Sequence, residues 1–338
     1  MKRKLFRALN FFIFFALGLL LLYLAFRDVN LEVLIADLKR ANYYWVALSL
    51  IFAFIAYISR AIRWRLLIEP LNYKPPIKNV FFALMFGYFA NLAFPRIGEI
   101  SRCGALAKTD KIPMDSLIGT VIIERTIDLV VLLILLIVVF LAKIETFGLF
   151  IKENVFIPIS KKFIATVDFS IYYWLMIIVL LAVIIFLFYH FRKKFKRVKI
   201  ILKIRKIIRG VFSGIKTVTK MRSRSKFLFH TLLIWLMYFL MTYVAFFSLP
   251  ATQGLKPIDG LFLLVIGGLG MAAPVQGGIG AFHWIISSAL TLYGISKTNG
   301  LALATILHES QMFMVIILGI ISVFAMFFIS RRKRKNNI

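Results

Sequence analysis

The sequence has few acidic side chains and a single cysteine. Cys103 stands alone in 338 residues, which excludes an internal disulfide and a multi-cysteine metal site. Asp and Glu number 14 against 43 Lys and Arg. Neither a GxxxxGK[ST] phosphate loop nor a GxSxG nucleophile motif occurs. We therefore expect no cofactor, no ATP hydrolysis by this chain and no enzyme activity.

Charged side chains are scarce overall, at 17% of the residues, whereas hydrophobic residues make up 61% and the mean hydropathy is +0.90. Soluble domains are roughly half apolar and a quarter charged, so the composition predicts a polytopic α-helical membrane protein. In a soluble protein, the net charge of +29 would suggest nucleic acid. Here the basic residues flank apolar stretches, which favours membrane orientation and contacts with anionic lipid, and no nucleic-acid partner.

Apolar stretches that could form membrane helices lie at 8–26, 43–59, 80–94, 114–142, 171–190, 227–249, 259–273, 280–293 and 301–329. The first is expected to be an uncleaved span rather than a signal peptide, because it is long and no small-residue cleavage site follows it. The 191–226 loop carries fifteen Lys and Arg and no acidic residue, and the chain ends in another basic run. The positive-inside rule therefore predicts a cytoplasmic loop and cytoplasmic N- and C-termini.

These orientations limit how many times the chain can cross. If 80–94 crossed the membrane fully, the basic loop 191–226 would face outward. We therefore predict that 80–94 enters from the cytoplasm, turns, and returns through about 98–108 as a re-entrant hairpin. By the same reasoning, 259–273 and 280–293 form a second hairpin that enters from outside.

The predicted fold is an all-α polytopic membrane protein built as an inverted repeat. Residues 1–150 and 171–330 form its two halves, each with three spanning helices plus one re-entrant helical hairpin. Residues 1–338 are then a single membrane domain. Backbone turns at membrane depth need protein or a wet cavity around them, so the two hairpins imply a shared polar cavity.

Polar and turn-forming residues interrupt the apolar pattern at the first hairpin: Asn91, Pro95, Arg96, Gly98, Glu99 and Arg102. Glu99 and Arg102 lie three residues apart and share a helix face if the return arm is helical. Arginine suits a lipid phosphate, and glutamate suits an amine or a proton, so this set is a candidate headgroup site. The alternative is a shallow hairpin whose charges are merely solvated at the interface.

Glu124, Arg125 and Asp128 lie on a long apolar span, where each charge would cost on the order of 3 kcal/mol if it faced lipid. They are expected to face the interior, either as a binding site or as an ion pair that staples the span to the first hairpin. A staple would leave one acidic group over. Arg60 and Arg63, at the end of the second span, either snorkel to the interface or capture a lipid phosphate.

The second hairpin turns at Pro274, Gln276, Gly277, Gly278 and Gly280, with His283 just beyond. Glycines permit exposed backbone N–H groups that bind an anion or a hydroxyl, although a tight turn alone would also need them. Glu309 follows Thr305 as Glu124 follows Thr120, which supports the repeat. His308 and Glu309 begin like a zinc-protease motif, but residue 312 is Met, so we expect no metal there.

Taken in order, four motifs resemble the lysylphosphatidylglycerol synthase transmembrane-region family, the flippase-like domain of MprF-type proteins. They are Arg60-Ala-Ile-Arg-Trp-Arg65, Gly87…Asn91…Pro95-Arg-Ile-Gly-Glu99…Arg102, Glu124-Arg-Thr-Ile-Asp128 and Pro274-Val-Gln-Gly-Gly-Ile-Gly280. The resemblance covers about residues 8–329, and Ala273-Pro-Val-Gln with His308-Glu-Ser-Gln311 is most like stand-alone members from Bacteroidetes. The sequence departs from many relatives at Phe282-His283, where they place Glu, and it ends at Ile338 without the aminoacyl-transferase domain of MprF-type proteins.

The resemblance implies an inner-membrane protein that moves a lipid between leaflets, which in MprF-type proteins is aminoacylated phosphatidylglycerol. We therefore expect a lipid flippase of the cell inner (plasma) membrane. Its partners would be membrane lipids with anionic or amino-phospholipid headgroups, and a homo-oligomer is compatible with the sequence. The alternatives are an ion-coupled small-molecule transporter on the same inverted repeat and a non-catalytic membrane scaffold.

Overall fold

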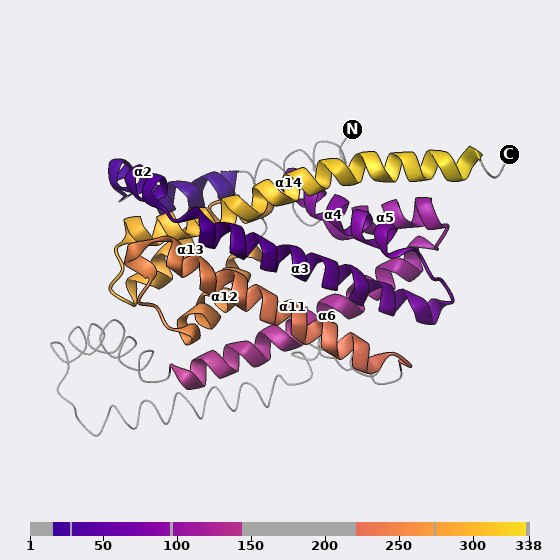
Figure 1. Cartoon of the computed structure of the whole chain (residues 1–338), viewed down its shortest axis with the longest axis horizontal. Helices are drawn as coiled ribbons and strands as arrows, with labels where there is room; N and C mark the ends of the chain where they lie inside the picture. Colours follow the sequence, from indigo (N-terminus) through magenta and orange to yellow (C-terminus); the bar gives the residue numbers. More distant parts are fainter. Residues whose placement is uncertain (1–15, 28, 95–96, 144–220, 274, 336–338) are drawn as a thin grey trace, which may run out of the picture.

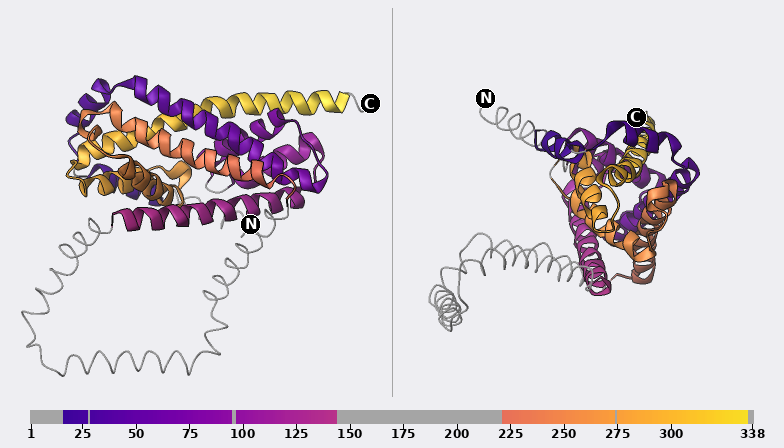
Figure 2. Two further views of the ribbon diagram at one scale, coloured as in Figure 1. Left: turned by 60° about the horizontal axis from the view of Figure 1, so that its bottom comes forward. Right: turned by 90° about the vertical axis from the view of Figure 1, so that its left-hand side faces the viewer.

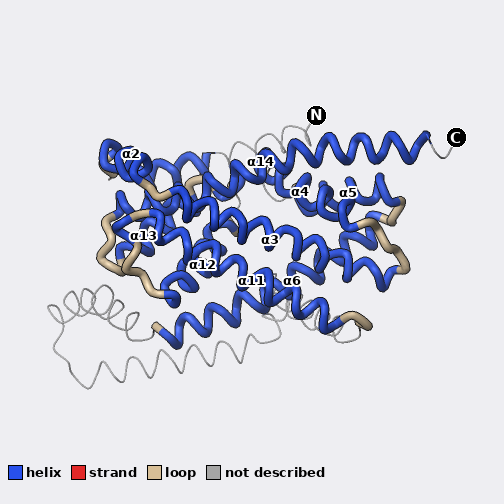
Figure 3. Tube along the Cα trace, in the orientation of Figure 1, coloured by secondary structure: helices blue, strands red, loops and turns tan. Residues whose placement is uncertain are grey.

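The computed structural model describes residues 16–27, 29–94, 97–143, 221–273 and 275–335, in which all regular structure is helical (Figure 3). After a short helix over Ala16–Phe26, the α-helices are α2 (Leu31–Arg40), α3 (Tyr43–Ile68), α4 (Ile77–Ala93), α5 (Gly98–Asp110), α6 (Met114–Ala142), α11 (Arg224–Val244), α12 (Pro257–Met271), α13 (Ala281–Thr291) and α14 (Lys297–Lys335). Short 3-10 turns follow some of them: η1 (Glu69–Leu71), η3 (Ala245–Ser248), η4 (Pro250–Thr252) and η5 (Gln276–Gly278).

Four of the described helical stretches are long and apolar enough to cross a membrane: Tyr43–Leu71, Met114–Ala142, Arg224–Ser248 and Lys297–Arg331. Helices of this length and composition satisfy their own backbone groups in hydrocarbon. The all-helical, multi-pass class predicted from composition is therefore confirmed.

Helices α3 and α11 pack lengthwise and antiparallel through the middle of the bundle (Figure 1). Ser49 of α3 donates a hydrogen bond to the Met241 carbonyl at 2.8 Å. Further along α3, Ser59 Oγ lies 2.9 Å from His230 Nδ1. Small hydroxyl residues let two helix backbones approach closely in a membrane protein. This pair forms the frame on which the other helices are placed.

Two shorter helix pairs, α4–α5 and α12–α13, approach the middle of the bundle from opposite ends (Figure 1). Their tips meet, because a Cβ on Gly277 in the second turn would lie 3.1 Å from Leu92 Cδ2 near the end of α4. Both pairs coincide with the segments expected to form hairpins. The two helices of each pair are thus observed, whereas the depth of each pair in a membrane and the inverted repeat stay predictions.

The first turn is stabilised by a side-chain cap and by close backbone packing. Asn91 Oδ1 accepts a hydrogen bond from the Gly98 N–H at 2.7 Å, which satisfies one free donor at the start of α5. A Cβ on Gly87 would lie 2.7 Å from the Gly98 carbonyl oxygen and 3.0 Å from Arg102 Cβ. Glycine at both positions therefore lets α4 and α5 touch backbone to backbone.

Helix α14 runs along one side of the bundle, and α6 lies along another edge (Figure 2). Only 11% of the most apolar 18-residue window of α6 is buried, compared with 50% for α11. Apolar side chains gather in one large cluster around α12, α13 and α14 and another around α3, α4 and α5. The charged groups of α6 lie beside the second cluster.

Several boundaries differ from the sequence prediction. The second span, expected at 43–59, continues to Ile68 because Arg60 and Arg63 are buried and paired rather than placed at an interface. Helix α2 was not predicted, although Asn30, whose side chain caps the Glu32 and Val33 N–H groups, is a helix-start signal. The expected span 171–190 and all but the last residues of the 191–226 loop lie outside the described residues.

Candidate functional site

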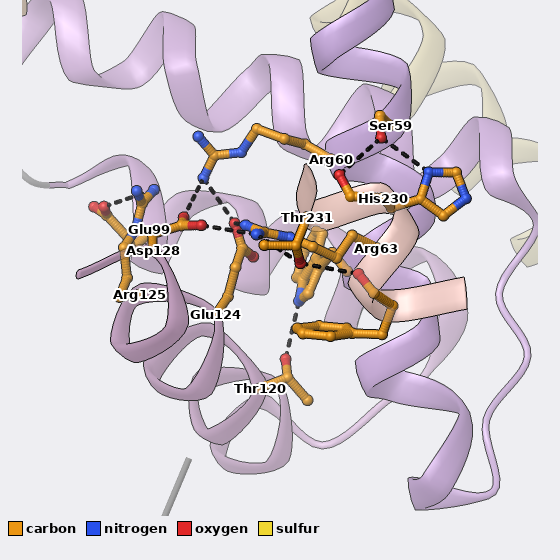
Figure 4. Close-up of polar contacts among 12 residues, drawn as sticks. Ser59, Arg60, Arg63, Glu99, Thr120, Glu124, Arg125, Asp128, His230 and Thr231 are labelled. Carbon is orange, nitrogen blue, oxygen red and sulfur yellow. Dashed lines mark hydrogen bonds and ion pairs between the residues drawn. The ribbon is translucent and has the colours of Figure 1, made fainter. Parts of the chain in front are cut away.

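A buried network of charged side chains joins three helices near the first turn (Figure 4). Helix α3 contributes Arg60 and Arg63, α5 contributes Arg102, and α6 contributes Glu124 and Asp128. The side chains of Arg60, Arg63, Arg102 and Glu124 are 8%, 0%, 2% and 0% exposed. The structure thus brings together residues from three of the motifs singled out in the sequence.

Glu124 is the centre of this network. Its Oε1 lies 2.7 Å from Arg60 Nη2 and 3.5 Å from Arg63 Nη2, and its Oε2 lies 2.9 Å from Arg102 Nη2. Charge-assisted bonds to both oxygens hold the carboxylate in one orientation. A single glutamate therefore connects α6 to both α3 and α5.

Asp128, one helical turn after Glu124, forms the remaining ion pairs with α3. Its Oδ1 lies 2.7 Å from Arg63 Nη1, and its Oδ2 lies 3.5 Å from Arg60 Nη2. Helix α11 supplies neutral partners, since Arg60 Nη1 donates to the Tyr238 hydroxyl at 3.0 Å and Arg63 Nη1 to Thr231 Oγ1 at 3.4 Å. The two arginines of α3 are therefore held by partners on both α6 and α11.

Aromatic rings cover the guanidinium groups. Arg102 lies 4.5 Å from the centre of the Trp64 ring, and the Trp64 indole N–H donates to Thr120 Oγ1 at 2.9 Å. Arg60 lies 5.6 Å from the centre of the Tyr88 ring. Such cation–π contacts are stronger away from water, and they explain how so much charge is tolerated in an apolar bundle.

The network carries a surplus of positive charge. Three guanidiniums face two carboxylates, so the described cluster has a net charge of 3 − 2 = +1. Within the part of the chain that the structure describes, Arg102 Nε and Nη1 have no hydrogen-bond partner, and neither have the Nε atoms of Arg60 and Arg63. Buried N–H donors without partners are rare and costly, so the site is better suited to an anion than to another cation.

Two alternatives from the sequence are corrected by this geometry. Arg60 and Arg63 do not snorkel, because their partners lie inside the bundle. Arg125 was expected to face the interior, but its side chain is 42% exposed and its Nη2 lies 3.3 Å from Glu99 Oε1, outside the network. The group left over is consequently a guanidinium, and the expectation of a spare acidic group is wrong.

The network is sealed in this structure, but a groove runs along the other face of α5. This groove, with a volume of about 720 Å³, lies between α5 and α14 and is lined by Ser101, Ala105, Lys108 and Arg331 among others. Arg102, next to Ser101, points instead into the bundle and is 2% exposed. Helix α5 therefore separates an open, partly basic groove from the buried arginines.

Of the remaining residues singled out at the first hairpin, some stabilise the turn and others lie outside the described residues. Asn91 and Gly98 form the cap and the close packing of the turn. Pro95 and Arg96 lie outside the described residues, as does Pro274 of the second turn.

The second turn is built from residues with left-handed backbones. Gly277, Gly278 and Gly280 have φ values of 57°, 81° and 78°, which favour glycine strongly. A Cβ on Gly280 would lie 2.5 Å from the Gly18 carbonyl oxygen. The turn thus needs glycine both for its conformation and for its contact with the first described helix, while the Gln276 amide nitrogen is buried and has no partner among the described residues.

His283 and Glu309 meet beside this turn, together with a residue that the sequence did not single out for a role. His283 Nε2 lies 3.5 Å from Glu309 Oε1, and His308 Nδ1 lies 3.0 Å from the same oxygen. Thr231 and Tyr238 were missed because each lies in an apolar span with no charged residue beside it, whereas His308 was noted only as part of an incomplete zinc-protease motif. The signal that could have found Thr231 and Tyr238 is their spacing of seven residues, which places them on one helix face.

Together, the described helices and their buried ion network define a multi-pass helical membrane protein with a polar interior. The sequence profile of the lysylphosphatidylglycerol synthase transmembrane region matches residues 11–319, and the chain belongs to this family. The likeness predicted from the four motifs is confirmed at the level of the family.

One curated relative is the UPF0104 membrane protein MJ1595 of Methanocaldococcus jannaschii, which is 30% identical over 108 residues. The match covers 31% of this chain and 32% of the relative, so it spans only about a third of either protein. Nothing in these comparisons supports the expected likeness to members from Bacteroidetes. No solved structure matches the chain.

Proposed function

We propose that this protein moves a phospholipid with an anionic headgroup between membrane leaflets, without ATP hydrolysis of its own. The observation that carries the proposal is the buried surplus of one guanidinium, with unused N–H donors on Arg102. Arginine forks match phosphate oxygens in charge and geometry. A lipid phosphate would supply the missing negative charge and the missing acceptors at the same time.

The proposal includes the membrane arrangement. Pair α4–α5 enters from the cytoplasm and α12–α13 from the opposite side, as re-entrant hairpins of an inverted repeat. In support, the Lys143–Asp259 pair at 2.6 Å and the Asn42–Ser248 backbone bond at 2.8 Å lie at helix ends assigned to the outside. Lys108 and Arg331, which line the open groove, lie at helix ends assigned to the cytoplasm, where basic residues are favoured.

A path for the headgroup follows from the two faces of α5. The phosphate of a cytoplasmic-leaflet lipid first occupies the groove between α5 and α14, near Lys108 and Arg331. A shift of α5 then exposes Arg102 to it, while the acyl chains stay in the bilayer. Because Glu124 holds Arg102 in the sealed state, the phosphate would compete with this carboxylate for the same guanidinium.

The test is leaflet exchange in liposomes that contain the purified full-length protein. A fluorescent phosphatidylglycerol and a fluorescent phosphatidylcholine are compared by adding a membrane-impermeant quencher. Exchange of phosphatidylglycerol should exceed the empty-liposome rate, and Arg102→Lys, which keeps the charge but loses the planar fork, should slow it.

Arg65→Gln provides a matched control, because Arg65 also lies on α3 but forms only a partly exposed pair with Glu69 at 3.5 Å. This variant should exchange lipid at the wild-type rate. If a broad panel of lipids exchanges no faster with the protein than in empty liposomes, the proposed function is wrong. Exchange that is insensitive to Arg102→Lys would remove the network from the mechanism.

A further inference from the structure

His283, His308 and Glu309 form a second polar cluster, separate from the arginine network. His283 lies on α13, and His308 and Glu309 lie on α14. One ligand atom from each lies within 4.8 Å of the other two. The histidines are 3% and 5% exposed, whereas the Glu309 side chain is 51% exposed. The cluster therefore has a buried floor and one accessible side.

Hydrogen bonding fixes which nitrogen of His308 carries the proton. His308 Nε2 lies 2.9 Å from the Gly277 carbonyl oxygen, which only accepts, so Nε2 must donate. In the neutral imidazole, Nδ1 then has a lone pair. That lone pair faces Glu309 Oε1 at 3.0 Å, and an ionised carboxylate also only accepts. Two hydrogen-bond acceptors at this distance repel each other unless a proton or a metal cation lies between them.

His283 is also incompletely satisfied. Among the described residues its Nδ1 has no hydrogen-bond partner, although the side chain is almost fully buried. Its Nε2 makes only the long 3.5 Å contact with Glu309 Oε1. The two imidazole ring centres lie 4.8 Å apart. A buried imidazole with an unfulfilled nitrogen thus points at the same carboxylate oxygen as His308.

We propose that these three residues bind a divalent transition-metal ion of the zinc type. Two imidazoles and one carboxylate are a donor set that zinc accepts, with a fourth position left for water or a ligand. Zinc bonds of about 2.0–2.1 Å in tetrahedral geometry place ligand atoms ~3.3 Å apart. The observed separations of 3.0 and 3.5 Å are close to this value, whereas the two imidazole nitrogens lie up to 4.8 Å apart and would have to approach by up to ~1.5 Å on binding.

The surroundings of the cluster favour such an ion. A metal-bound histidine commonly donates its other N–H to a backbone carbonyl, and His308 does so to Gly277. Imidazole donors favour zinc, copper or nickel over magnesium and calcium, which prefer oxygen. Since Gly277 belongs to the turn between α12 and α13, the ion would fasten this turn to α14.

The local sequence concealed the site. A zinc-protease motif needs its second histidine four residues after the first, and that position is Met312. The fold supplies the second imidazole from α13 instead, 25 residues earlier by number (308 − 283). The glutamate is also used differently, because here it is a ligand and not a general base.

Zinc binding to the purified full-length protein tests the inference. The protein carries a tag without histidine, is stripped with a chelator, and is titrated with Zn²⁺ and separately with Mg²⁺ by calorimetry. One saturable Zn²⁺ site per chain is expected, with no Mg²⁺ site. His283→Ala and His308→Ala should each weaken Zn²⁺ binding by at least ~10-fold, which is the scale of losing one interaction around a metal.

His230→Ala is the matched control, because His230 contacts Ser59 on another pair of helices and should leave Zn²⁺ binding unchanged. Glu309→Gln covers the case in which a histidine variant does not fold, since Glu309 is half exposed. Zinc should raise the unfolding temperature of the wild type and not that of Glu309→Gln. Absence of a saturable site, or a site that survives all three substitutions, would overturn the proposal and leave a shared proton between His308 and Glu309.

Discussion

Arg102 and Glu124 meet at 2.9 Å between α5 and α6, and their side chains are 2% and 0% exposed. This contact ties the return arm of a helix hairpin to a spanning helix with a buried charge pair. Such a pair is costly to break, because removing one partner leaves the other charge unpaired in a low-dielectric interior. Glu124 occupies only Nη2 of Arg102, so another anion could use the free Nε and Nη1 donors but would have to displace Glu124 to take the whole guanidinium.

Glu124→Gln should destabilise the protein strongly. The substitution leaves Arg60, Arg63 and Arg102 facing a single carboxylate, and losing one member of a buried pair costs about 3–5 kcal/mol. The unfolding temperature in detergent should fall markedly or the monodisperse yield should collapse. Glu69→Gln, which removes a partly exposed partner of Arg65, should change stability by less than ~1 kcal/mol. Equal effects of the two substitutions would contradict the geometry.

Gly98→Ala should open the first hairpin. Its Cβ would overlap the Gly87 carbonyl oxygen and lie 2.6 Å from Asn91 Cγ. Overpacking of this kind costs about 1–3 kcal/mol. Gly104→Ala on the same helix meets nothing within 4 Å, so its higher helix propensity should leave stability unchanged or raise it by ~1 kcal/mol. Thermal unfolding of both variants is the measurement, and a destabilising Gly104→Ala would argue against this packing.

Substitutions of Gly280 and Gly294 distinguish the cost of backbone strain from the cost of close packing near the second turn. Gly280 and Gly294 have φ values of 78° and 73°, but only Gly280 would place a Cβ against backbone atoms of another helix. Gly294→Ala should cost the left-handed strain alone, about 1–2 kcal/mol. Gly280→Ala should cost clearly more, in the same unfolding assay. Similar losses would mean that the first described helix does not pack on this turn.

The proposed re-entrant topology predicts which face of the membrane each loop occupies. In a Cys103→Ala background, Lys74→Cys and Asp115→Cys should react with an impermeant maleimide only from the cytoplasmic side. Gln253→Cys and Ser296→Cys should react only from the outside. The loop before a helix pair and the loop after it should thus be labelled from the same side of the membrane. Labelling of Lys74→Cys and Asp115→Cys from opposite sides would show that α4–α5 crosses the membrane once.

Apolar helices were predictable because their signal is local. Segment 114–142 coincides with α6, and the segments on either side of each turn coincide with α4, α5, α12 and α13. Hydrophobic length alone determines such a helix in a membrane protein. The end of α3 was not predictable in this way. Arg60 and Arg63 are buried because they pair with carboxylates far along the chain, and a local pattern does not show these partners.

The site was predictable as a set of residue types but not as a set of pairs. Charges in apolar spans were expected to face inward, which identified Glu124 and Asp128 correctly and Arg125 wrongly, because its side chain is 42% exposed. Arg102 was named for its place at the first hairpin, and Arg60 and Arg63 for their place at the end of the second span. The pairing of Arg125 with Glu99 could not be predicted, because Asp128, three residues after Arg125, is an equally well-spaced partner. The contact of His308 with His283 could not be predicted either, because the two residues lie on different helices.

Helix α6 is held by ion pairs around its middle and at its C-terminal end, and by little else. Glu124 and Asp128 fasten its middle, the Lys143–Asp259 pair fastens its end, and only 11% of its most apolar window is buried. A helix held at so few points can rotate about its own axis more easily than it can make other movements. Because both carboxylates project from one side of the helix, a modest turn would withdraw them from all three guanidiniums in a single movement.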